Sequence, residues 1–199
     1  MAPRRWSWLT TGLSVVGATA LLGQVRPPEP HVDRGVCPFE CCTYRDWTAD
    51  STIRVYREEG SRAAVALLLA RGDTFQAVTG NVHIVRLGIV RMRRPYTVFS
   101  ETDARPPNVL DTIPLGVNDT AYVLSYRGEG YYDVWIRGQV HAVAAFWDDR
   151  RLYPRPTGTP GVLVQEPDER WWVQIRTRDG RTGWILMSEA AVSGADACG

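Results

Sequence analysis

The stretch WWVQIRTRDGRTGWI, residues 171–185, contains three of the eight tryptophans of this 199-residue chain. Two apolar runs flank an Arg-Asp-Gly sequence, a pattern typical of a tight turn between two β-strands. Side chains alternate across a strand, so Trp171 shares one face with Val173 and Ile175. That aliphatic pair marks its face as core. Trp171 is therefore expected inside, and Trp172 on the opposite, outer surface.

The same β pattern extends through the rest of the chain. Alternating apolar residues centre on Ile53 and Val55, and two extended runs flank Gly80-Asn81, a favourable hairpin dipeptide. Two more runs flank a turn at Gly128–Gly130. Residues 63–70 are rich in Ala and Leu, which favour helix, but eight residues make only a short helix and an extended segment is preferred. We expect an all-β protein of short antiparallel strands.

A second aromatic strand is expected at residues 131–137, which read YYDVWIR. Alternation there directs Tyr132, Val134 and Ile136 into the core. Tyr131, Asp133 and Trp135 then point outward.

The opening stretch resembles the C-terminal half of bacterial SH3-like domains. The residues that match this pattern are Trp172, Ile175, Asp179-Gly180 and Gly183-Trp184-Ile185. The resemblance implies small SH3-like barrel modules of five strands, in a family that is commonly exported and that binds ligands rather than catalysing reactions.

Domain boundaries follow from size and composition. Residues 161–199 are too few to bury a core unaided, so we expect them to pack with the hairpin at 115–150. The predicted organisation is a signal peptide or anchor at 1–20, a flexible spacer at 21–36, a Cys-rich start and first β module at 37–100, a linker at 101–114, and an SH3-like domain at 115–199 with a Pro-rich insertion around 147–162.

The N-terminus has the pattern of an export signal. Arg4 and Arg5 precede an uncharged run from residue 9 to residue 22, and Ala18-Thr19-Ala20 offers small residues at a cleavage site. The pattern predicts a periplasmic or secreted protein. An uncleaved segment that anchors the chain to the membrane is the alternative.

The four cysteines are Cys37, Cys41, Cys42 and Cys198. An even number in an exported chain favours disulfides. One of the first three is expected to reach Cys198, and the other two to pair across a short loop, with Cys37 bonded to Cys41 or Cys42. The spacing lacks the paired knuckles usual for zinc.

No nucleophile, metal or cofactor motif stands out, so we expect no catalytic residue, no metal and no cofactor. The formal charge of +1 gives no general attraction to nucleic acid. The ligand-binding candidates are the outward aromatics and their polar neighbour, namely Trp172, Trp135, Tyr131, Arg176 and Trp184. Two interpretations of this surface stay open: other parts of the chain cover it, or it binds a ligand.

The sequence therefore predicts an exported, non-enzymatic SH3-like binding module for a cell-envelope component such as a cell-wall polymer, a peptide or a partner protein. The alternative is a structural or accessory subunit whose aromatic faces are buried against another chain.

Overall fold

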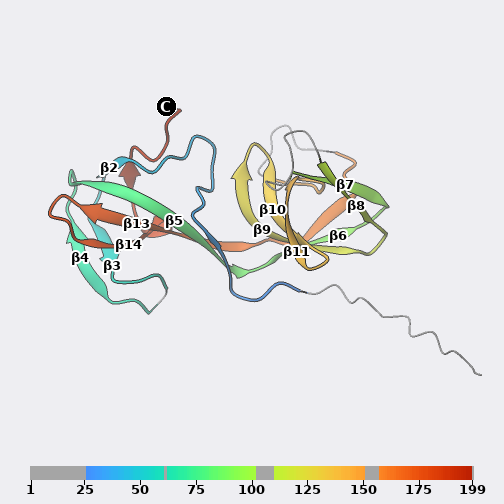
Figure 1. Ribbon diagram of the computed structural model, residues 1–199, viewed down its shortest axis with the longest axis horizontal. Helices are drawn as coiled ribbons and strands as arrows, with labels where there is room; N and C mark the ends of the chain where they lie inside the picture. The colour runs from blue at the N-terminus through green and yellow to red at the C-terminus, as the bar shows by residue number, and fades with distance from the viewer. Residues whose placement is uncertain (1–25, 61, 102–109, 151–156, 199) are drawn as a thin grey trace, which may run out of the picture.

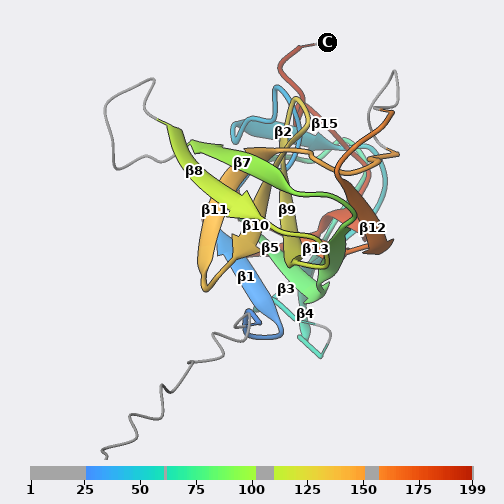
Figure 2. The ribbon, with the colours of Figure 1, turned by 90° about the vertical axis from the view of Figure 1, so that its right-hand side faces the viewer.

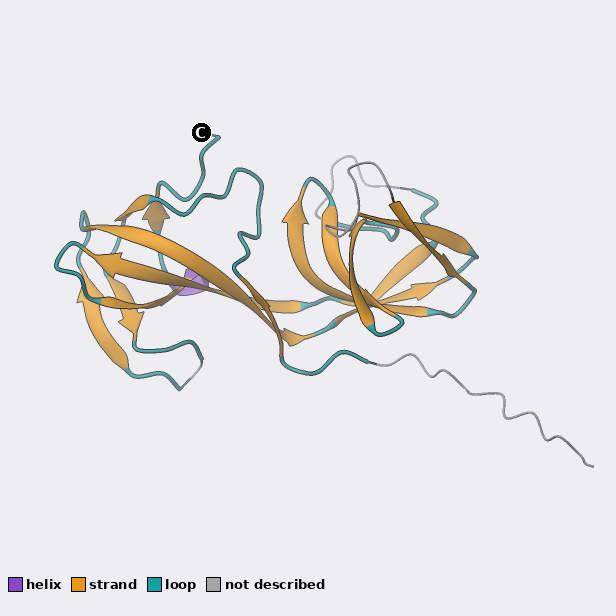
Figure 3. Ribbon diagram, viewed as in Figure 1, coloured by secondary structure: helices purple, strands orange, loops and turns teal. Residues whose placement is uncertain are grey.

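The computed structural model describes residues 26–60, 62–101, 110–150 and 157–198. Figure 3 shows that strands dominate this part of the chain, and the one helical element described is a single 3-10 turn, Met187–Glu189. All pairings between the named strands are antiparallel. The predicted all-β, antiparallel class is confirmed. The strands are not uniformly short, however, because β5 has 13 residues and β13 has 10.

The strands form two sheets. The first sheet has the order β15-β2-β5-β13-β14-β3-β4, with β1 also paired to β5. Its strands are β1 (His31–Arg34), β2 (Asp46–Ala49), β3 (Ile53–Tyr56), β4 (Val65–Leu69), β5 (Thr74–Arg86), β13 (Asp168–Thr177), β14 (Thr182–Leu186) and β15 (Val192–Ser193).

The second sheet has the order β12-β6-β9-β10-β11-β7-β8. Its strands are β6 (Gly88–Met92), β7 (Tyr96–Glu101), β8 (Leu110–Leu115), β9 (Thr120–Gly128), β10 (Tyr131–Ile136), β11 (Gln139–Ala144) and β12 (Gly161–Gln165).

Each sheet curls into its own lobe, and the two lobes lie side by side (Figure 1). The terminal lobe combines residues 26–86 with residues 166–198, whereas the inserted lobe is the continuous segment 87–165. The long strands β5 and β13 carry the chain from one lobe to the other and back. Figure 2, which faces the inserted lobe, shows its strands curling around one another.

Three apolar clusters hold this arrangement together. The core of the terminal lobe contains Trp47, Val55, Phe75, Val173 and Ile185, among others. The core of the inserted lobe contains Val90, Val123, Tyr132, Val143 and Trp147, among others. A smaller junction cluster joins the lobes; its buried members are Val82, Ile84, Leu87 and Leu124. Trp171 packs against both the terminal core and the junction cluster.

Several local expectations are confirmed. The segment 63–70 contributes the strand β4, so its extended interpretation is right. The turn at Gly128–Gly130 separates β9 from β10, and all three of its residues have positive φ. Gly180 has a φ of 84° in the turn between β13 and β14. Glycine accepts this left-handed conformation without a steric cost.

The expected hairpin at Gly80-Asn81 is wrong, because β5 runs through both residues as one strand. Gly80 serves a packing role there. A Cβ atom at this position would lie 2.1 Å from Tyr44 Oη and 2.4 Å from Trp171 Nε1. A dipeptide that favours a turn thus allows the close approach of two aromatic side chains to a continuous strand.

The C-terminal segment does need a packing partner, but the expected partner is wrong. β13 pairs with β5 along its whole length, and β14 pairs with β13 and β3. Among the described residues 161–198, only β12 joins the sheet that contains the 115–150 hairpin, through β6. The chain therefore returns to its first sheet after building the second one, a non-local pairing that local sequence patterns do not show.

The predicted spacer and linker also contain strands. In the spacer 21–36, β1 pairs with β5, and in the linker 101–114, β8 pairs with β7. The signal segment 1–20, residues 102–109 of the linker and residues 151–156 of the Pro-rich insertion lie outside the described residues. In the described ranges, no helix is long and apolar enough to cross a membrane.

Candidate functional site

Trp172 lies on the outer face of β13, as alternation predicts, but it is not exposed. Its side chain is only 2% accessible. The Tyr56 ring meets it edge-on with centroids 5.5 Å apart, and the His83 ring lies 6.4 Å away. Of the two interpretations left open for this surface, cover by other parts of the chain is therefore confirmed for Trp172, and its exposure to a ligand is wrong. Alternation fixes the face of a strand and does not reveal what covers that face.

The cover over Trp172 includes a polar cluster. Glu59, in the loop between β3 and β4, accepts a hydrogen bond of 2.7 Å from Asn81 Nδ2 and pairs with His83 Nε2. The other end of the Asn81 amide accepts from the backbone N–H of Gly35 at 3.1 Å. Buried polar groups are stable when they are bonded in this way. The cluster ties the β3–β4 loop to β5 beside the indole.

The remaining candidates on this sheet stay closer to solvent. Trp184 is half-buried, and its strand neighbours are Gln174 on β13 and Tyr56 on β3. Arg176 is exposed on the same face. These residues belong to the terminal lobe.

The two other aromatic candidates belong to the inserted lobe. Tyr132, Val134 and Ile136 are buried, so the predicted inner face of β10 is confirmed. Trp135 points outward but packs against the junction cluster, with the His31 ring 6.5 Å away. Trp172 and Trp135 therefore lie on different sheets and do not form one shared aromatic surface.

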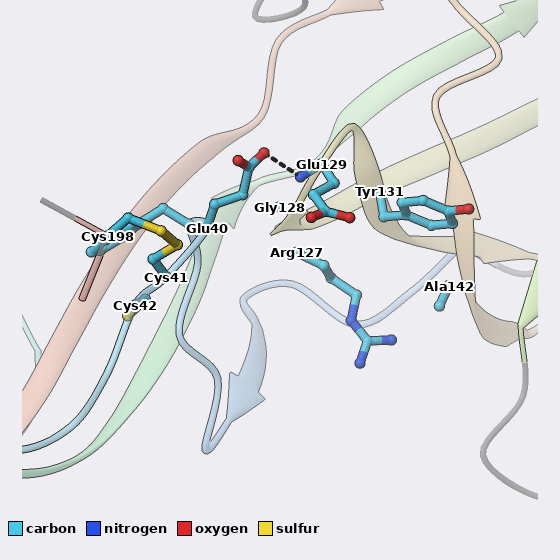
Figure 4. A pocket seen from close by; sticks show the side chains of 10 residues that line it. Glu40, Cys41, Cys42, Arg127, Gly128, Glu129, Tyr131, Ala142 and Cys198 are labelled. Atoms are coloured by element: carbon cyan, nitrogen blue, oxygen red, sulfur yellow. Dashed lines mark hydrogen bonds between the residues drawn. A yellow bond between two sulfur atoms is a disulfide. The ribbon is translucent and has the colours of Figure 1, made fainter. Parts of the chain in front are cut away.

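Tyr131 instead lines a cleft of about 750 Å³ between the lobes. One wall is the disulfide-bonded loop of the terminal lobe, and the other is the β9–β10 hairpin with Ala142 of β11 (Figure 4). Three charged side chains line the cleft: Glu40 from the loop, and Arg127 and Glu129 from the hairpin. Binding sites are common at such interfaces between structural units.

Two disulfides shape the loop wall. Cys37 bonds to Cys42, and Cys41 bonds to Cys198, which confirms the predicted long-range bridge and short loop. Cys41 has a φ of 58°, so the loop turns sharply at the residue after Glu40. The Cys41–Cys198 bridge faces the cleft (Figure 4).

A hydrogen bond crosses the cleft between its two walls. The backbone N–H of Glu129 donates to the Glu40 carboxylate at 2.7 Å (Figure 4). Gly128 permits this approach, since a Cβ atom there would lie 3.1 Å from Glu40 Cγ. The Glu129 carboxylate extends from the same turn and is exposed.

A polar network lies between β1 and the inserted lobe, close to the cleft. The buried hydroxyl of Ser125 donates to Asp33, and its oxygen lies 3.3 Å from Asp133 Oδ2. His31 Nε2 bonds to Asp33 Oδ1 at 2.8 Å. Arg127, which also lines the cleft, lies 3.5 Å from the other oxygen of Asp133.

The charge state of this network depends on Asp133. Burial raises the pKa of the Asp133 carboxyl, and the nearby Asp33 raises it further, while Arg127 and the Ser125 hydroxyl oppose the rise. A hydroxyl has one hydrogen to donate, so Ser125 cannot bond to two ionised carboxylates at once. A proton on Asp133 would let its O–H donate to Ser125 while Ser125 donates to Asp33.

The hydroxyl and the sulfurs nearest the cleft are engaged within the chain. The Ser125 hydroxyl is buried and bonds to carboxylates, whereas a nucleophilic serine needs a base such as histidine within hydrogen-bond reach. The ligand atoms of Cys41, Asp196 and Cys198 lie within 4.8 Å of one another. Both sulfurs are joined in a disulfide, so neither is the thiolate that a metal ion requires.

Comparison with family models, curated proteins and solved structures found no match. The SH3-like resemblance of residues 171–185 stays a prediction from the sequence.

Sequence reasoning missed the charged residues of the cleft. In the sequence, Glu40 belongs to the cysteine motif CPFECC, and Glu129 is one residue of the predicted turn at Gly128–Gly130. Their proximity depends on the Cys41–Cys198 bridge and on the packing of the two lobes. The sequence held only a partial signal, which was a charged residue in each of two constrained turns.

Proposed function

We propose that the protein is an exported, non-enzymatic binding module that holds its ligand in the cleft between the two lobes. The observation that carries this proposal is the cleft itself, whose walls come from both lobes and present charged groups to solvent. Two disulfides and the export-signal pattern at the N-terminus support a location outside the cytoplasm.

The charges of the cleft favour a ligand with positive groups. Glu40 and Glu129 contribute two exposed carboxylates, whereas the guanidinium of Arg127 already lies beside Asp133. Tyr131 adds a half-buried ring on the hairpin wall of the cleft, and this ring suits the apolar part of a peptide or a sugar. A cationic segment of a peptide or of a cell-envelope polymer satisfies both features.

Two of the aromatic residues, Trp172 and Trp135, do not support the accessory-subunit alternative. That alternative assumed aromatic faces that another chain would bury. Trp172 is covered by Tyr56 and the Glu59 cluster, and Trp135 packs on the junction cluster. Their burial takes place within this chain.

A direct test uses a fluorescein-labelled peptide of alternating lysine and alanine, and its glutamate counterpart, in anisotropy titrations. The lysine peptide should bind and the glutamate peptide should not. Glu129→Gln keeps the backbone N–H and removes one carboxylate, so the affinity for the lysine peptide should fall about 3- to 10-fold.

The matched control is Glu58→Gln, which changes an exposed glutamate in the terminal lobe outside the cleft. This variant should bind like the unmodified protein. An equal loss of affinity in the two variants would show that the peptide responds to the overall charge of the protein. The cleft would then not be the binding site.

A further inference from the structure

The edge strand β4 forms a second exposed surface, far along the first sheet from the cleft. It is the last strand in the sheet order and pairs with β3 alone. The unpaired side of an edge strand presents free backbone N–H and C=O groups to an incoming strand. Residues 64–70 read AVALLLA, so this edge carries no charge and no proline along its length.

The exposed side chains of β4 are apolar. Leu68 is 61% accessible, the highest fraction among the exposed large apolar residues that the structure describes, and Val65 is 46% accessible. Soluble proteins usually protect an edge with a charged residue, a proline or a bulge. The edge strand β8 of the other sheet follows that rule with Pro114, whereas β4 has neither a charge nor a proline and departs from a regular ladder only at one register shift, opposite Val55 and Tyr56.

The apolar surface continues from the edge onto the outer face of the sheet. Val65 pairs with Tyr56 on β3, and Tyr56 pairs with Trp184 on β14, both of them half-buried. At the C-terminal end of β4, a hollow of about 280 Å³ is lined by Leu68, Leu69 and Arg178 among others. The edge thus adjoins both an aromatic face and a recess that can accept side chains.

Arginines surround this surface. Arg54 pairs with Leu68 on the neighbouring strand, and the backbone N–H of Arg57 bonds to Ala64 at 2.9 Å. Arg62 and Arg71 flank the strand at its two ends, and both are exposed. Among the nearby acids, Glu59 bonds to Asn81 and His83, and Glu189 accepts from the Tyr56 hydroxyl at 2.8 Å and lies 4.0 Å from Arg54. In the hollow, Asp73 accepts from the Ala70 backbone N–H and Asp179 bonds to Thr177 and Arg181, while Glu58 in the β3–β4 loop is exposed.

We propose that β4 is a docking edge for an extended segment of another protein, apolar in its centre and acidic at both ends, which adds to the sheet as a further strand. Main-chain hydrogen bonds supply affinity in this mode of recognition, and side-chain pockets and charges supply specificity. The arginines at the two ends select acidic flanks.

The charges disfavour a second copy of this chain as the occupant. In an antiparallel self-pairing centred on Leu67, Arg71 of one copy would lie next to Arg62 of the other. Like charges at neighbouring cross-strand positions are destabilising. A partner with acidic flanks replaces this repulsion by attraction.

The test uses two synthetic peptides with the same Val-Thr-Val-Ile-Val centre, one with Glu-Asp flanks and one with Lys-Arg flanks. Calorimetric titration into the full chain should show saturable binding of the acidic-flanked peptide, at least about 10-fold tighter than the basic-flanked one. Leu68→Asp introduces a carboxylate on the edge and should abolish this binding.

The matched control is Val164→Asp on β12, which is the second edge strand of the other sheet; Val164 is 56% accessible. This variant should bind the acidic-flanked peptide like the unmodified protein. Hydrogen exchange should show slower exchange at β4 amides in the complex, which a merely non-specific association would not produce.

Three results would overturn the proposal. The first is no saturable binding of the acidic-flanked peptide, and the second is equal loss of binding in Leu68→Asp and Val164→Asp. The third is a concentration-dependent dimer of the unmodified protein, seen by light scattering, that Leu68→Asp converts to monomer. That result would assign the edge to a second copy.

Discussion

The two lobes are built from similar strands but close in different ways. The inserted lobe is continuous in sequence, and its core forms from residues 87–165 alone. The terminal lobe needs β5 to meet β13, and the whole inserted lobe separates these two strands in the chain. It also holds both disulfides. The lobe with the less local connectivity is the one that is covalently closed.

The largest expected effect comes from removing the long bridge. Cys41 and Cys198 are 157 residues apart, so the bridge restricts the unfolded chain strongly. The double variant Cys41→Ser/Cys198→Ser should lose about 4–5 kcal/mol in the free energy of unfolding if chain entropy dominates. Urea denaturation followed by tryptophan fluorescence measures this quantity.

The short bridge is the control, since Cys37 and Cys42 are only 5 residues apart. Removing it with two serines should cost about 2 kcal/mol by the same reasoning. Hydrogen exchange should show that loss of the long bridge weakens the terminal lobe first. A larger loss from the short bridge, or early opening of the inserted lobe, would contradict the comparison.

Emptying one core at a time sharpens the comparison. Trp47→Ala in the terminal core and Trp147→Ala in the inserted core each remove a buried indole, and each should cost about 3–5 kcal/mol. The location of the damage should differ. Trp147→Ala should increase hydrogen exchange in the inserted lobe while β5 and β13 stay protected.

That asymmetry follows from topology. The terminal lobe can keep its β5–β13 pairing and its disulfides while the inserted lobe opens as a long loop. Uniform loss of protection throughout the chain in Trp147→Ala would mean that the two lobes unfold as one unit.

A smaller effect is expected from the contact between β1 and the inserted lobe, and it depends on pH. Burial and the neighbouring Asp33 raise the pKa of Asp133, so the folded protein binds this proton more tightly than the unfolded chain. The contribution to stability is present below the usual pKa of an aspartate, and it is lost as pH rises through the raised value. The other charged groups facing Asp133 are His31, across Asp33, and Arg127.

Asp133→Asn should remove this dependence, because asparagine does not titrate in the range. The measurement is the free energy of unfolding of both proteins from about pH 3 to about pH 7. The difference in free energy of unfolding between the two proteins should change in the interval just above the usual aspartate pKa. As pH rises through this interval, the unmodified protein should become less stable relative to Asp133→Asn. A difference that stays constant with pH would show that Asp133 does not contribute to the pH dependence of stability.

The smallest expected effect concerns the hydrogen bond that crosses the cleft. Glu40→Ala should cost about 0.5–1.5 kcal/mol, since a single hydrogen bond is lost near solvent. The Glu129 amide should exchange faster with solvent. Glu58→Ala provides the control at an exposed glutamate outside the cleft. Unchanged exchange at Glu129 in the Glu40 variant would show that this bond does not hold the lobes together.

The sequence predicts the local features of this fold well. Alternation identifies the inner faces of β10 and β13, and the cysteine count leads to the correct long bridge. These predictions succeed because the period of a strand and the need to pair thiols are properties of short segments or of simple counts.

The failures share a physical cause. Trp172 is covered by Tyr56 and by the polar cluster around Glu59 and His83. Gly80 accommodates two aromatic side chains next to a continuous strand. Both depend on residues distant in the sequence. The return of β13 to β5 is likewise non-local, and the cleft exists only after the two lobes have packed. Patterns within one segment do not contain this information.

The central claim is that the cleft between the lobes is the binding site, and backbone amide NMR tests it most directly. During titration with the lysine–alanine peptide, the largest shifts should map to residues 39–42, 127–131 and 198, which line the cleft. The outer face of the first sheet, including β4, should stay unchanged. Saturable shifts confined to that outer face, with no change around Glu40 and Glu129, would contradict the account.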